Sequence, residues 1–122
     1  MELAEQFPAE RIRTRINDMY NVLSGRPNVA LQIGGQSYTV YKVPEYQTNV
    51  VFTCTSGPDN PAITGYSWRH NSNILVNEVT NTYTISSVSQ SHDGTYTCSA
   101  TNVEGTGTSA AMDLDVLCKL LY

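Results

Sequence analysis

The spacing of hydrophobic residues changes once along the chain. Between Ala9 and Ser24, apolar side chains recur at steps of three and four residues, which is the spacing of one face of a helix. Pro8 suits the start of that helix, and Gly25 suits a left-handed stop after it. We therefore expect residues 1–26 to be a helical extension. It is either the end of a preceding domain or a segment that self-associates through its apolar stripe.

From residue 27 to residue 117 the hydrophobic period is two, as in half-buried β-strands. The pair Gly34-Gly35 interrupts the first stretch, which is typical of an edge strand that passes from one sheet to the other. Such consistent alternation predicts an all-β domain. The alternating segments are 28–33, 38–43, 50–55, 66–69, 82–88, 95–101 and 112–116.

Length and composition agree with one β domain. The 122 residues suit a single domain with a short extension, and only 15% of them are charged. Threonine, serine, valine and tyrosine are abundant, which favours strands over helices. We expect three parts: the extension at 1–26, a β domain at 27–117, and a C-terminal tail at 118–122.

The charge of the β domain limits its partners. Residues 27–117 contain seven acidic residues and only two basic ones, Lys42 and Arg69, which gives a net charge of −5. We therefore expect no nucleic-acid partner and no attraction to anionic membranes. No stretch reaches the roughly 18 apolar residues of a membrane span, so we expect no direct membrane insertion by this chain.

Two cysteines and two aromatic residues form the strongest pattern in the sequence. Cys54 and Cys98 bracket Trp68, and Tyr96 lies two residues before the second cysteine. Residues 27–117 thereby resemble an immunoglobulin superfamily domain, an antiparallel β-sandwich. The resemblance implies that Cys54 and Cys98 form a disulfide between the sheets, that Trp68 packs on it, and that the Tyr96 hydroxyl bonds to main chain upstream.

A metal site or free thiols are the alternative reading of the cysteines. Metal sites need about four ligands, and the chain has neither a C-x-x-C pair nor paired histidines, so we expect no metal and no cofactor. A disulfide framework indicates an oxidising compartment. Since residues 1–5 lack the features of a signal peptide, we expect a piece of a secreted or membrane-anchored extracellular protein.

The region before Cys98 departs from the family pattern D-x-G-x-Y-x-C. His92 stands where that pattern has aspartate, and Asp93 follows it. No lysine or arginine lies between His70 and Leu117, so the basic partner of the usual aspartate is missing as well. His92 is either a pH-responsive contact or a residue that makes one main-chain hydrogen bond.

Spacing narrows the subtype. Between Trp68 and Tyr83 only about one further strand fits, which excludes the longer variable type and leaves an I-set or C2-like domain. The stretch Ala100-Thr101-Asn102-x-x-Gly105 resembles the A-x-N-x-x-G of I-set domains and predicts a hairpin. After the last strand, Cys118 is an odd cysteine, either an intermolecular thiol or a consequence of where the sequence stops.

These features predict recognition rather than catalysis. His70 and His92 lie in no catalytic motif, and Asp113 and Asp115 fit the solvated face of a strand, so we expect no enzyme. We expect an extracellular module of a receptor or adhesion protein that binds a protein partner, a second copy included. A structural spacer between neighbouring domains is the alternative. The candidate contacts are the 57–63 loop, the hairpin with Asn102, Glu104 and Thr106, and the sheet face with Arg69.

Overall fold

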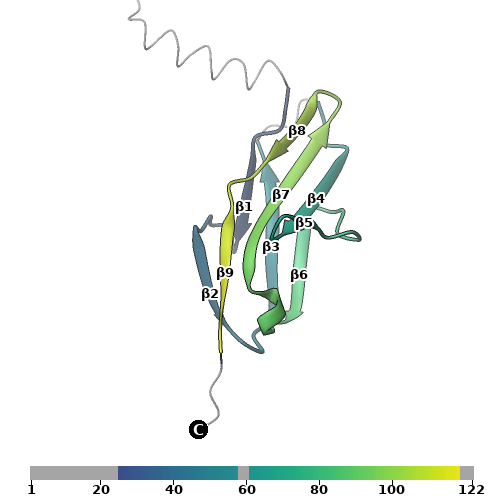
Figure 1. The fold of residues 1–122 in the computed structure, drawn as a ribbon. Coiled ribbons are helices and arrows are strands. Elements are labelled where there is room, and N and C mark those ends of the chain that lie inside the picture. Colours follow the sequence, from purple (N-terminus) through teal and green to yellow (C-terminus); the bar gives the residue numbers. More distant parts are fainter. Residues whose placement is uncertain (1–24, 58–60, 119–122) are drawn as a thin grey trace, which may run out of the picture.

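Two β-sheets stacked face to face form the domain (Figure 1). The computed structural model describes residues 25–57 and 61–118. The helix expected between Ala9 and Ser24 lies outside these residues. Within them, the helical structure is limited to one 3-10 turn, η1 (Gln90–His92). No helix in this described part has the length and hydrophobicity that a membrane crossing requires.

The first sheet has three antiparallel strands in the order β1-β3-β6. Its central strand shows the expected alternation, because Val50, Phe52 and Cys54 are buried while Val51 is exposed. Hydrophobic period two therefore located the inner face of this sheet correctly. The strands are β1 (Val29–Ile33), β3 (Thr48–Ser56) and β6 (Thr82–Ser87).

The second sheet has the order β2-β9-β7-β4-β5, and β8 pairs with the end of β7. The β4–β5 hairpin turns through Asn71 and Ser72, both with positive φ, as a two-residue turn requires. The strands are β2 (Val40–Pro44), β4 (Gly65–His70), β5 (Asn73–Ile74), β7 (Gly94–Asn102), β8 (Gly105–Thr108) and β9 (Met112–Leu117).

One edge differs from the expected antiparallel arrangement. Strand β2 pairs parallel with β9, with Val40 opposite Asp113 and Pro44 opposite Leu117. The cause is the break at Gly34-Gly35, whose φ angles of 62° and 83° form a tight turn after β1. The chain then joins the other sheet and continues in the direction of β1, which is also the direction of β9 (Figure 1).

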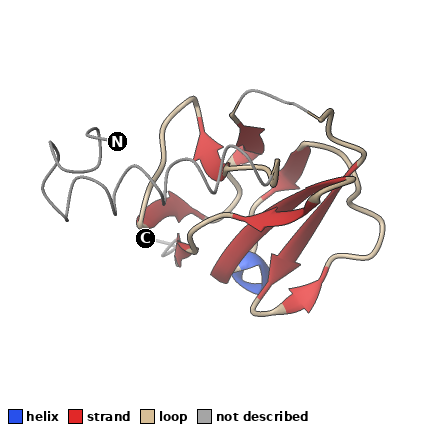
Figure 2. Ribbon diagram, turned by 90° about the horizontal axis from the view of Figure 1, so that it is seen from above, coloured by secondary structure: helices blue, strands red, loops and turns tan. Residues whose placement is uncertain are grey.

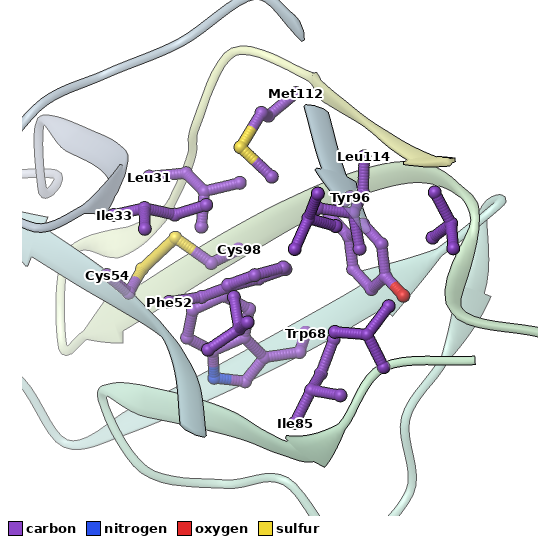
Figure 3. Close-up of a cluster of buried hydrophobic side chains, with 14 residues drawn as sticks. Leu31, Ile33, Phe52, Cys54, Trp68, Ile85, Tyr96, Cys98, Met112 and Leu114 are labelled. Carbon is purple, nitrogen blue, oxygen red and sulfur yellow. A yellow bond between two sulfur atoms is a disulfide. The ribbon is translucent and has the colours of Figure 1, made fainter. Parts of the chain in front are cut away.

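The disulfide lies at the centre of the sandwich (Figure 3). Cys54 and Cys98 are bonded with a Cα–Cα distance of 6.0 Å, as the resemblance implied. Trp68 of β4 lies directly opposite Cys98 of the neighbouring strand β7. The fully buried rings of Phe52 and Tyr96 meet edge to face at 5.0 Å. Every strand except β5 and β8 contributes to the core: Leu31, Ile33, Val43, Val50, Phe52, Cys54, Trp68, Ile85, Val88, Tyr96, Cys98, Met112, Leu114 and Val116.

The turn before β7 contains the expected tyrosine corner. The Tyr96 hydroxyl donates to the His92 carbonyl at 2.6 Å, and burial raises the pKa of Tyr96 far above its usual value, so the hydroxyl stays protonated. His92 Nδ1 accepts the Ser89 N–H at 3.0 Å, which is a main-chain hydrogen bond of the kind that the second interpretation of His92 expects. The displaced Asp93 carboxylate accepts the Val116 N–H at 2.8 Å and so ties the corner to β9.

Replacing Tyr96 with phenylalanine is expected to lower the free energy of unfolding by about 1–1.5 kcal/mol, because it removes one largely buried hydrogen bond without changing the ring. Denaturant unfolding measures this loss. The control is Tyr66→Phe, since Tyr66 is half-buried and its hydroxyl makes no hydrogen bond to the described residues. Equal losses in the two variants would contradict a stabilising role for the corner.

Candidate functional site

The structure brings two of the three expected contact surfaces to one end of the sandwich. The β7–β8 hairpin (Asn102–Gly107) lies beside Pro61, in the second half of the 57–63 loop, and beside the incoming chain Gly25–Pro27. We call these residues together the N-terminal pole, and Figure 2 looks down on it. Residues 58–60 of the loop lie outside the described part. Strand β9 ends at the opposite pole (Figure 1).

Asn102 holds the N-terminal pole together. Its amide nitrogen donates to the carbonyl oxygens of Gly25 at 2.6 Å and Pro61 at 3.1 Å, and its amide oxygen accepts the Glu104 N–H at 2.8 Å. The residue is only 5% exposed. The structure thus places this expected contact residue inside the domain, where its side chain binds main-chain groups, because the alternation of β7 turns it inward.

The incoming chain lies closely against the hairpin. A Cβ atom on Gly107 would overlap the Pro27 carbonyl oxygen, and a Cβ on Gly25 would lie 2.6 Å from the Glu104 side chain. Gly25 also has a φ of 75°, a left-handed conformation that favours glycine. The position of the hairpin is thus set by hydrogen bonds and by close packing together.

The tip of the hairpin is open to solvent. Val103 is 77% exposed, and Glu104 and Thr106 are exposed beside it. The Thr106 hydroxyl lies 2.8 Å from that of Thr101, which ties the outer side of the hairpin. The tip therefore presents one apolar, one acidic and one hydroxyl side chain. Val103 was not among the expected contacts, although its place between Asn102 and Gly105 marked it as a turn residue.

Arg69 is not part of this pole. It lies near the end of β4, where it is paired with Thr97 of β7. The five-residue step along β7 from Thr97 to Asn102 corresponds to about 17 Å. The Arg69 guanidinium is exposed and donates weakly to the Ser72 carbonyl at 3.4 Å. Arg69 remains a separate candidate contact on the outer face of the second sheet.

The described side chains offer little for catalysis or metal binding. Ser89 Oγ lies 3.2 Å from His92 Nδ1, but that nitrogen already accepts the Ser89 N–H, so the pair caps η1. His70 Nε2 contacts the Asp93 carbonyl at 2.7 Å, and its ring stacks on Tyr96. Within residues 25–57 and 61–118, no cluster of three His, Cys, Asp or Glu residues is able to hold a metal ion.

Comparison with known proteins agrees with this architecture. A family model described as immunoglobulin domain matches residues 26–116, which is most of the chain. A sequence comparison with curated proteins gave no match.

Solved structures show the same fold. The crystal structure of the N-terminal four Ig domains of Dscam1 isoform 4.44 is similar with a TM-score of 0.54 and 21% identity, over 73% of this chain and 21% of that one. The corresponding structure of Dscam1 isoform 6.44 is similar with a TM-score of 0.53 and 22% identity, over 73% and 21% of the two chains. This chain thus spans about a fifth of the length of those chains, and the likeness concerns the fold alone.

Asn102→Ala is expected to lower the free energy of unfolding by about 2–4 kcal/mol, because it leaves buried main-chain groups of the N-terminal pole without partners. Chemical denaturation measures the loss. The neighbouring Val103→Ala variant is the control and should change the stability by less than about 0.5 kcal/mol, since Val103 is exposed. A loss below about 1 kcal/mol for Asn102→Ala would show that the pole does not depend on this amide.

Proposed function

This chain belongs to the immunoglobulin domain family, and we propose on that premise that it is an extracellular module that recognises a protein partner through its N-terminal pole. The observation that carries the proposal is an exposed apolar residue on a rigid base. Val103 is 77% exposed, while Asn102, directly before it, is buried and hydrogen-bonded to two other segments and to the hairpin turn itself. A turn held in this way loses little conformational entropy on binding, which favours affinity.

The disulfide indicates the compartment in which the module acts, and the charge indicates which partners are disfavoured. The Cys54–Cys98 bond supports an oxidising compartment, and hence the extracellular side. The net charge of −5 on residues 27–117 disfavours nucleic acid and anionic membrane surfaces as partners. A protein surface with an apolar pocket and a basic rim would complement Val103 and Glu104 best.

The position of the chain ends supports the spacer role as a second candidate. The described chain comes in at the N-terminal pole and leaves β9 at the opposite pole (Figure 1). Asn102 also ties the incoming chain at Gly25 directly to the domain. A module connected in this way would hold its neighbouring domains at a fixed distance, without a ligand of its own.

Binding by the hairpin tip is expected to disappear in the triple variant Val103→Ser, Glu104→Ser, Thr106→Ala. The probe is the full chain, biotinylated and assembled on streptavidin, and binding to intact cells is measured by flow cytometry. The affinity of the variant should fall at least about tenfold, because residues near the centre of an interface carry most of the binding energy. Its unfolding midpoint should fall only slightly, because Asn102 is retained and the lost Thr101–Thr106 hydroxyl contact is exposed.

A matched control exists in the segment before β6. Val76→Ser, Glu78→Ser, Thr80→Ala changes the same residue types in the same way, and Val76 is 76% exposed. Loss of binding with the hairpin variant alone supports the N-terminal pole. Loss with the control set alone would move recognition to the β6 side, and full binding by both variants would favour the spacer.

Cys118 is proposed as an intermolecular thiol. It is exposed and free, and it follows β9 at the pole opposite the hairpin. Mild oxidation of the full chain should produce a dimer on non-reducing electrophoresis that is absent from Cys118→Ser. The buried Cys54–Cys98 bond does not compete, because both cysteines are at most 2% exposed. A monomer under these conditions would remove the proposed role.

A further inference from the structure

Strand β6 is an open edge of the first sheet. Constant-type immunoglobulin sandwiches have four strands in this sheet, with one more strand beyond the equivalent of β6. Here the sheet is β1-β3-β6, and among the described residues no strand pairs with the outer side of β6. The segment from Leu75 to Asn81, which precedes β6, contains no strand, and its Val76 and Val79 are 76% and 62% exposed.

The main-chain groups on this outer side can be assigned. The Cys54 N–H donates to the Asn81 carbonyl at 2.8 Å, so the main-chain groups of Asn81 face β3. Because these directions alternate along a strand, the N–H and carbonyl groups of Thr82, Thr84 and Ser86 point away from β3. Only the Thr82 carbonyl has a partner within the described chain, the Thr80 hydroxyl at 3.1 Å. The open edge is therefore centred on Thr84.

This sheet also lacks the usual protection against pairing. Natural sheet edges are blocked by charges, by proline or by short length. The edge strand β2 carries Lys42 and Pro44, and β5 is only two residues long. By contrast, β6 has neither charge nor proline, and the sequences of all three strands of the first sheet contain no charged residue: VALQI, TNVVFTCTS and TYTISS.

We propose that β6 pairs edge to edge with β6 of a second copy of this chain, antiparallel about a two-fold axis at Thr84. Thr84 then faces Thr84 of the second copy, Thr82 faces Ser86, and Tyr83 faces Ile85. The two three-stranded sheets become one continuous sheet. This association uses a different surface from the N-terminal pole, so the two proposals fail independently.

The choice of a second copy as the occupant follows from self-complementarity. A two-fold interface requires one surface to match itself. In this register the outer face has hydroxyl opposite hydroxyl at every pair, and the inner face has the aromatic Tyr83 opposite the β-branched Ile85; both kinds of cross-strand pair are favourable. The absence of charge on this sheet also matters, because the acidic domain as a whole repels its own copies.

Charge substitutions at the axis test the pairing. Thr84 is exposed and its hydroxyl makes no hydrogen bond to the described residues, so both Thr84→Lys and Thr84→Glu should fold. In the proposed register each variant places like charges directly opposite one another, which should raise the dissociation constant at least about tenfold. An equimolar mixture of the two variants places lysine opposite glutamate and should associate again.

The measurement is sedimentation equilibrium of the full chain up to about 1 mM, a range suited to weak interfaces. Cys118→Ser is included in every sample to exclude disulfide dimers. Thr39→Lys adds the same charge beside the other sheet, near β2, and should leave the dissociation constant of the dimer unchanged. The unfolding midpoint of each variant verifies folding.

A concentration-dependent dimer that both single variants weaken and their mixture restores would support the pairing. A wild type that stays monomeric at about 1 mM would overturn it. Two other results would also overturn it: single variants that dimerise as well as the wild type, and a mixture that fails to recover.

Discussion

The disulfide between Cys54 and Cys98 is the constraint on which the rest of the domain depends, because it joins the central region of one sheet to that of the other. Strand β3 lies between β1 and β6, and β7 lies between β9 and β4. Closing a loop with a sequence separation of 44 stabilises the fold by about 4 kcal/mol in the chain-entropy account. Around the bond, Phe52, Trp68 and Tyr96 fill the space between the sheets (Figure 3).

Strand β7 connects this core to the proposed recognition surface. Its inward positions are Tyr96, Cys98, Ala100 and Asn102, and all four are buried. The first three complete the corner, the disulfide and the apolar core, while the last reaches the end of the sandwich, where main-chain carbonyls converge. The same alternation that builds the core thus delivers one amide to the N-terminal pole. Core stability and hairpin geometry are consequently coupled through one strand.

Period-two spacing was enough to predict the inner face of most strands, and the cysteine, tryptophan and tyrosine pattern predicted the disulfide and the corner correctly. Asn102 was interpreted as a contact because it belongs to the predicted hairpin. Its role inside the domain was not foreseen, since the carbonyls it binds, at Gly25 and Pro61, are 77 and 41 residues away in sequence. Convergence over such distances depends on sheet packing, which hydrophobic spacing does not encode. For the same reason the parallel pairing of β2 with β9 was not predicted.

The two sheets differ in the charged residues of their strands, and therefore in the contacts that each sheet permits. The charged residues within the strands, Lys42, Arg69, Asp113 and Asp115, all belong to the second sheet. Two of these residues are basic and two are acidic, so the strands of that sheet carry no net charge, but each charge must be matched or desolvated when the sheet meets another surface. The strands of the first sheet have only hydroxyl, amide and apolar side chains, and among the described residues no strand pairs with the outer side of β6 or of β1. An acidic domain can approach its own copy most easily along such an edge, where main-chain hydrogen bonds supply attraction that charge does not oppose.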